Sequence, residues 1–73
     1  MPNNIDYEQV MRDTLSNKPI MEALFILNEE LKKLREHIPS IRSEFYISIM
    51  YDITVCKALL KELNDTGKIN KSS

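Results

Sequence analysis

The sequence is short of the residues that cross-link or staple a small fold. Its 73 residues include one cysteine, one histidine, one glycine and no tryptophan. A single cysteine excludes a disulfide within the chain, and Cys56 with His37 cannot assemble a zinc site from one molecule. A chain of this length buries only roughly 60% of the surface that its unfolded form exposes. We therefore predict no metal or other cofactor, and we expect oligomerisation to support the fold.

Long apolar runs and an excess of one charge are also missing. No apolar stretch approaches the roughly 20 residues that span a membrane, and residues 1–6 lack the basic and apolar regions of a signal peptide. The net charge is −1, which gives no overall attraction to nucleic acid or to an anionic membrane. We therefore expect a cytoplasmic protein with no membrane partner, in agreement with its lone cysteine.

The residue patterns of common enzymes are missing as well. The sequence has no glycine-rich phosphate loop and no nucleophile elbow. Cys56 is expected inside a packing face while His37 lies near a turn, so the two would not form a nucleophile and its base. Glu29 and Glu30 would point about 100° apart on a helix and would not converge on one substrate. We predict a protein that is not an enzyme and has no small-molecule substrate.

What the sequence does have is a regular apolar seam. Six apolar residues at alternating spacings of four and three fall on one side of a helix, which must bury them against another helix. They are Ile20, Leu24, Leu27, Leu31, Leu34 and Ile38. The spacing predicts a helix over residues 19–37 that starts at Pro19. Ahead of it, Asp6 and Gln9 form a capping-box pattern, which predicts a short helix over residues 6–16 lying across the others.

The last third of the chain is open to two interpretations. Residues 45–55 alternate apolar side chains with period two and are rich in β-branched and aromatic residues, which is typical of a strand. A second seam favours a helix over residues 40–65, because it continues into helix-forming sequence and because a lone strand would have no partner. Its members are Tyr46, Ile49, Ile53, Cys56, Leu60 and Leu63. Gly67 would end this helix, and residues 67–73 would form a frayed polar tail.

These elements predict an all-α fold with one domain, residues 1–66. A short N-terminal helix would be followed by a long antiparallel helical hairpin, turned at residues 39–40 and completed by dimerisation or by a partner helix. In length and layout, residues 19–64 resemble two kinds of small helical-hairpin protein, the plasmid RNA-modulating dimers and the needle-subunit co-chaperones of type III secretion systems. The resemblance implies a protein that works by binding another macromolecule.

Two sets of residues are candidates for binding. Some apolar side chains exceed what a core of this size can cover, which predicts an interaction surface for a protein partner or a second copy: Met21, Phe25, Phe45, Met50 and Leu59. The chain would then act as an adaptor, a co-chaperone or an inhibitor of a host protein. The alternative is a dimeric RNA- or DNA-binding regulator using the basic residues Lys32, Lys33, Arg35 and Arg42. Several glutamates lie among these basic residues, which argues against nucleic acid as the partner.

Overall fold

The computed structural model describes residues 6–38 and 43–71. Within these two ranges the chain forms three α-helices and no strand: α1 (Tyr7–Leu15), α2 (Ile20–His37) and α3 (Ser43–Thr66). The predicted all-α class is confirmed, and the strand alternative for the start of α3 is wrong. The turn predicted at residues 39–40 and the helix start predicted at residue 40 lie outside the described part of the chain.

The first two helices begin where the sequence signals predict. The Asp6 carboxylate accepts a hydrogen bond from the Gln9 backbone N–H at 3.3 Å, which satisfies one of the free N–H groups at the start of α1. Pro19 has extended backbone geometry and stands just before α2 as its cap. Its carbonyl accepts from the Ala23 N–H at 2.9 Å. A proline loses nothing here, because a helix has no use for an N–H donor at its start.

Gly67 ends α3 with a left-handed backbone. Its φ is +81°, and its N–H donates to the Leu63 carbonyl at 2.8 Å. Residues with a Cβ adopt this conformation at a cost, so glycine suits the position directly after a helix. A Cβ at this position would lie 3.8 Å from Cδ1 of Ile20, the first residue of α2. The end of α3 therefore lies beside the start of α2.

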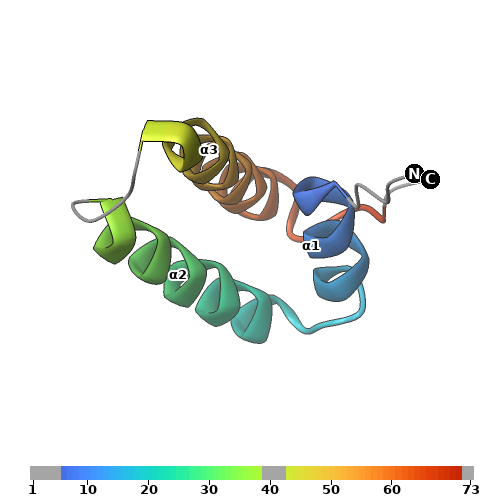
Figure 1. The fold of residues 1–73 in the computed structure, drawn as a ribbon. Coiled ribbons are helices and arrows are strands. Elements are labelled where there is room, and N and C mark those ends of the chain that lie inside the picture. Colours follow the sequence, from blue (N-terminus) through green and yellow to red (C-terminus); the bar gives the residue numbers. More distant parts are fainter. Residues whose placement is uncertain (1–5, 39–42, 72–73) are drawn as a thin grey trace.

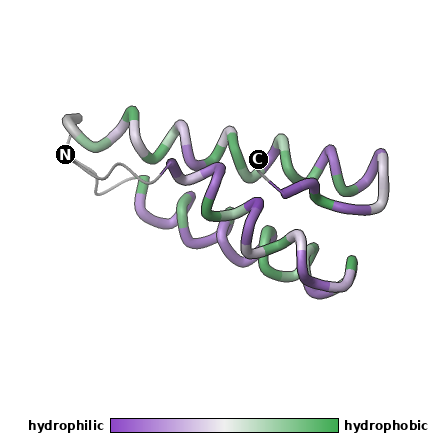
Figure 2. The backbone as a smooth tube through the Cα atoms, turned by 90° about the vertical axis from the view of Figure 1, so that its right-hand side faces the viewer, coloured by the Kyte–Doolittle hydropathy of each residue, from purple (hydrophilic) through white to green (hydrophobic). Residues whose placement is uncertain are grey.

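The three helices form a core with α1 at one end. Figure 1 shows α2 and α3 on opposite sides of the molecule's interior, and α1 lying across the end where α2 begins. Hydrophobic and hydrophilic stretches alternate turn by turn along the helical tubes (Figure 2), as expected for helices with one buried face. Within the described residues, no helix combines the length and apolar character that a membrane crossing requires.

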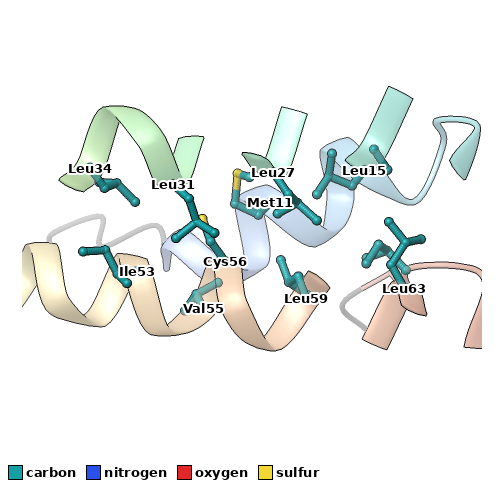
Figure 3. Close-up of a cluster of buried hydrophobic side chains, with 12 residues drawn as sticks. Met11, Leu15, Leu27, Leu31, Leu34, Ile53, Val55, Cys56, Leu59 and Leu63 are labelled. Carbon is teal, nitrogen blue, oxygen red and sulfur yellow. The ribbon is translucent and has the colours of Figure 1, made fainter. Parts of the chain in front are cut away.

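The core side chains come from all three helices and are ordered along the molecule. Figure 3 shows Leu34 beside Ile53 at one end of the cluster, Leu31 beside Cys56 in the middle, and Leu15 with Leu63 at the other end. Much of the first seam is buried, with Leu24 and Ile38 only partly covered and Ile20 exposed. The buried residues are Met11, Leu15, Ala23, Leu27, Leu31, Leu34, Ile53, Val55, Cys56, Leu59, Leu63 and Ile69.

The buried face of α3 is wider than the second seam. Besides the buried seam members it includes Val55 and Leu59, because α1 packs against α3 on a side that α2 does not cover. Leu59 is only 1% exposed, so its prediction as part of an interaction surface is wrong. At the start of α3 the opposite holds, because the seam residue Tyr46 is exposed.

The segment after Gly67 packs against the helices over its described part. Ile69 is 4% exposed and belongs to the core. Arg12 Nη1 donates to the Asn70 carbonyl at 3.1 Å, and the Asn70 N–H donates to Glu62 Oε2 at 3.0 Å. Two side chains from different helices therefore hold the backbone of this segment. The expected fraying does not describe residues 68–71, and residues 72–73 lie outside the described part.

A charged network joins α1, α3 and this last segment. The Arg12 guanidinium donates to both Glu62 carboxylate oxygens, at 3.0 and 2.8 Å, and its Nε donates to Glu8 at 2.9 Å. Both Arg12 and Glu62 are about one-fifth exposed. Hydrogen bonds from Arg12 and from the Asn70 N–H hold the pKa of Glu62 below its ordinary value. A two-pronged, partly buried pair of this kind fixes direction as well as distance.

Candidate interaction surfaces

Two large apolar side chains stand out from the first half of α2. Met21 is 74% exposed and Phe25 is 65% exposed. They are four residues apart, so they lie one above the other on the same face of the helix. The buried residues Ala23 and Leu27 are each two positions from Met21 or Phe25. Two positions correspond to a rotation of about 200° around the helix, so the exposed pair lies on the face opposite the buried one. We call Met21 and Phe25 the α2 surface.

Polar groups border the α2 surface. Lys18 Nζ lies 3.7 Å from Glu22 Oε2 in an exposed pair, and Asn28 Nδ2 donates to the Leu24 carbonyl at 2.9 Å. The apolar pair therefore has polar groups along part of its border. An apolar centre with a polar rim is the usual composition of a protein–protein interface.

A second exposed apolar region occupies the first turns of α3. Phe45 and Ile47 are 56% and 78% exposed, and Tyr46 between them is also exposed. Consecutive helical residues point about 100° apart, so this part of α3 is uncovered on several sides. Ile49 and Met50 follow and are partly buried against the core. We call residues 45–47 with Met50 the α3 surface.

The α2 and α3 surfaces lie at opposite ends of the molecule. Ile20 lies beside Gly67, so the start of α2 is level with the end of α3. Phe45 is 14 residues before Leu59, which corresponds to about 21 Å along the helix axis. The apolar residues predicted as one interaction surface are thus divided between two places, and Leu59 lies in neither. Ile47 and Tyr46 were missed as surface residues, although the lack of charge over residues 45–51 was a usable signal.

The lone cysteine lies in a polar contact at the centre of the core. The Tyr7 hydroxyl donates to Glu30 Oε1 at 2.8 Å and lies 3.4 Å from Cys56 Sγ. Burial raises the pKa of the Cys56 thiol, and burial together with these two contacts raises the pKa of Tyr7. A reactive thiol needs a lowered pKa and access to solvent, and Cys56 has neither. Cys56 and Tyr7 therefore act as packing residues, and the Tyr7 hydroxyl and the Cys56 thiol are hydrogen-bonding partners of each other.

Acidic groups near this contact do not make a metal site. Tyr51 donates to Asp6 at 2.9 Å, and Asp52 is half-buried nearby on α3. Burial first, and then the negative charges of Glu30 and Asp6, raise the pKa of Asp52. In the ranges that the structure describes, no three His, Cys, Asp or Glu side chains are grouped so that they could hold a metal ion.

The basic residues predicted to contact nucleic acid lie on the outer side of α2. Lys32, Lys33 and Arg35 are exposed, whereas Arg42 lies outside the described residues. Glu36 is exposed among them, and Glu29, four residues before Lys33, is on the same side of the helix. The resulting field changes sign over short distances. Phosphate binding is favoured by a continuous basic stripe, and the described part of α2 does not provide one.

Comparison with protein-family models, with curated proteins and with solved structures finds no match for this chain. The fold and its surfaces place it among small all-α proteins.

Proposed function

We propose that this chain is a non-catalytic protein-interaction module, acting as an adaptor, a co-chaperone or an inhibitor, and that its α2 surface binds a helix of a partner protein. The observation that carries the proposal is the exposure of Met21 and Phe25 on one helix face. Large apolar and aromatic side chains at a spacing of four are typical anchors in helix-to-helix and helix-to-groove contacts. Leaving them in water gives the folded chain no advantage of its own.

The proposed arrangement behind this surface is an antiparallel hairpin of α2 and α3, completed by a second copy or a partner helix. Its support is the position of Gly67 beside Ile20, which places the end of α3 at the start of α2. It is supported further by two ordered pairs along the core that join α2 and α3, Leu34 with Ile53 and Leu31 with Cys56 (Figure 3). A hairpin that is covered on only one side leaves outer faces for binding.

Site-specific photo-crosslinking tests the α2 surface directly. A photoreactive phenylalanine analogue replaces Phe25 in the full-length tagged chain, and the same analogue replaces Lys57, an exposed residue on the outer side of α3. We expect a protein to be captured from position 25 and not from position 57. We also expect the capture to disappear when Met21→Asp is added, because a carboxylate cannot enter an apolar interface without a large desolvation cost.

Calorimetry with the captured protein then gives the affinity. We expect Phe25→Asp to weaken binding by more than about tenfold, as is usual for a buried aromatic anchor. Far-UV circular dichroism should show unchanged helix content, because Phe25 is outside the core. An affinity equal to that of the wild type, or equal capture from positions 25 and 57, would reject the α2 surface.

Nucleic-acid binding is the second candidate function, and the observation that favours it is the exposure of three basic residues on α2. The double change Lys32→Ala with Lys33→Ala would weaken such binding and reduce its dependence on salt concentration. A mobility-shift assay of the wild-type chain with RNA and DNA at low salt is the measurement. No shift under these conditions would remove this candidate.

A further inference from the structure

We infer that α1 and α3 form a binding site for a short peptide, and that the chain's own residues 68–71 occupy this site in the folded structure. The ligand is a peptide with one large aliphatic side chain, followed by a residue whose backbone N–H and C=O are both free to bond. We call this site the end site, and it consists of Arg12, Glu62 and the part of the core that Ile69 covers. It is separate from the α2 surface, so the inference goes beyond the proposed function and does not depend on it.

The end site holds the backbone of Asn70 at two points. The Asn70 N–H donates to Glu62 Oε2 at 3.0 Å, and the Asn70 carbonyl accepts from Arg12 Nη1 at 3.1 Å. A residue in an antiparallel sheet exchanges the same pair of bonds with the residue opposite it. Both bonds go to the backbone and Asn70 itself is exposed, so the site does not read the side chain of this residue. Proline is the exception, because it has no N–H to donate.

A single side chain anchors the segment in the core. Ile69 is the only apolar residue among residues 68–71, and it is 4% exposed. Lys68, Asn70 and Lys71 are exposed. Extended peptides are commonly recognised in this way, with main-chain hydrogen bonds that give affinity and a pocket for a side chain that gives specificity. The segment therefore has the contact pattern of a bound peptide.

The polar half of the end site is held in place by bonds that do not involve the segment. Arg12 donates to both carboxylate oxygens of Glu62, and its Nε donates to Glu8. These bonds lie within and between α1 and α3, so they can remain when residues 68–71 leave. Hydrogen bonds, that from Arg12 first, hold the pKa of Glu62 below its ordinary value, which keeps the acceptor charged at neutral pH. The donor and the acceptor for a peptide backbone are thus pre-organised.

The attached segment competes with any free peptide for the end site. Gly67, with its left-handed backbone, joins the segment directly to α3, and Figure 1 shows the segment beside α1 in orange to red. A short connection gives an attached ligand an effective concentration in the millimolar range. The end of a chain that is held by few contacts opens without unfolding of its helices. Residues 68–71 therefore act as an inhibitor of the site that a competing peptide can replace.

Peptide titration of a full-length variant tests the inference. In Ile69→Asp the attached segment cannot dock, because a carboxylate does not enter an apolar core without a large desolvation cost. The probe is a synthetic peptide with the sequence of residues 66–73, and NMR of labelled leucine methyl groups in the chain follows its binding. We expect Ile69→Asp to bind this peptide at least about tenfold more tightly than the wild type, whose site is occupied. Adding Arg12→Ala to Ile69→Asp should weaken binding by about tenfold.

A matched set of peptides separates backbone recognition from general apolar binding. The Asn70→Ala peptide keeps the N–H and the C=O of this residue, so it should bind as tightly as the peptide of natural sequence. The Asn70→Pro peptide lacks the N–H that donates to Glu62, and it should bind at least about tenfold more weakly. The Ile69→Asp peptide lacks the apolar anchor and should not bind.

A second pair of full-length variants guards against loss of the fold in Ile69→Asp. Asn70→Pro keeps the Ile69 side chain and removes the N–H that donates to Glu62, which should weaken docking of the attached segment. Asn70→Ala is its matched control and should behave as the wild type. We expect the peptide of natural sequence to bind the Asn70→Pro chain more tightly than the Asn70→Ala chain. Far-UV circular dichroism of each variant reports whether the helices are formed.

Four results would overturn the inference. The first is a folded Ile69→Asp or Asn70→Pro chain that does not bind the natural-sequence peptide at millimolar concentration. The second is equal affinity of the wild type and Ile69→Asp for this peptide, and the third is equal affinity of the Asn70→Ala and Asn70→Pro peptides. The fourth is loss of helix content in both variants, which would make residues 68–71 a part of the fold and not a ligand. These results leave the α2 surface to be decided by the crosslinking experiment.

Discussion

The two ends of the molecule differ in how far the chain covers its own apolar surface. We call the end where α1, the start of α2, the end of α3 and residues 68–71 meet the closed end, and the start of α3 the open end. At the closed end, Leu15, Leu63 and Ile69 are buried and a charged network ties the elements together. At the open end, Phe45 and Ile47 lie on a formed helix and remain exposed. Folding thus accounts for the apolar residues of the closed end, whereas it leaves those of the open end in water.

The largest difference between the two ends should appear when one side chain is shortened at each. Leu63→Ala at the closed end removes a fully packed side chain and should lower the free energy of unfolding by about 2–5 kcal/mol. Ile47→Ala at the open end should change it by less than about 0.5 kcal/mol. Urea unfolding followed by circular dichroism is the measurement, at a chain concentration below that of self-association.

The outcome of this pair is decisive in either direction. The total stability of a domain this small is on the order of 5 kcal/mol, so a Leu63→Ala chain that is unfolded before urea is added would agree with the expectation. Equal effects of the two substitutions would contradict it. They would mean that Ile47 is packed within a single chain, and the contrast between the two ends would be lost.

A smaller effect is expected from the charged network at the closed end. Arg12→Ala removes the two hydrogen bonds to Glu62, the bond to Glu8 and the bond to the Asn70 carbonyl. We expect a loss of about 1–3 kcal/mol in the free energy of unfolding, because a partly buried carboxylate is left with fewer partners. Hydrogen exchange followed by NMR should show faster exchange of the Asn70 amide, whose N–H donates to Glu62.

Two further variants sharpen this test. Lys61→Ala breaks the pair with Asp65, which is mostly exposed, and should leave both stability and the exchange of residues 68–71 unchanged. Arg12→Lys keeps the charge and loses the two-pronged geometry, so it should fall between the wild type and Arg12→Ala. Amide exchange at Asn70 that stays as slow in Arg12→Ala as in the wild type would show that the segment is held without Arg12.

Sequence periodicity predicted the helices because their buried faces follow local spacing. Both seams place apolar residues every three or four positions. For the last third of the chain, the high helix propensity of the residues after Cys56 favoured a helix over a strand. Asp6, Pro19 and Gly67 gave the helix ends for the same reason, since a cap acts on its own turn. These signals lie within a few residues of what they determine.

The errors concern contacts between distant parts of the chain. The burial of Leu59 requires α1 to pack on a second side of α3, and no local pattern at Leu59 shows this. The burial of Ile69 requires the polar segment around it to be held by Arg12 and Glu62 from two different helices. At the α3 surface, Tyr46 fits the seam in sequence and is exposed because the longer helix extends past its neighbour. Periodicity indicates which face of a helix is apolar. It does not indicate how far the neighbouring helix extends along that face.

The smallest effects are expected from two carboxylates whose pKa values shift in opposite directions. Hydrogen bonds from Arg12 and from the Asn70 N–H lower the pKa of Glu62 at the closed end from 4.5. Its contribution to stability is therefore present above the unfolded pKa and is lost as the pH falls through the lower folded value. Burial raises the pKa of Asp52, toward the open end, from 3.8. The charged form of Asp52 opposes folding, and this opposition decreases as the pH falls through the raised folded pKa.

Neutral replacements should therefore act with opposite signs. At neutral pH we expect Asp52→Asn to increase the free energy of unfolding by on the order of 0.5 kcal/mol, because an uncharged group avoids both burial of charge and repulsion from Glu30. Glu62→Gln should decrease it. Urea unfolding of the wild type and both variants, repeated from neutral pH down to about pH 3, is the measurement.

The gain in the free energy of unfolding from Asp52→Asn should shrink first as the pH falls, because Asp52 of the wild type takes up its proton. The loss from Glu62→Gln should persist to lower pH, since the bonds from Arg12 keep that carboxylate charged. A decrease in stability for Asp52→Asn would mean that Asp52 accepts a favourable contact in solution, and the acidic residues near Tyr7 would then stabilise the fold.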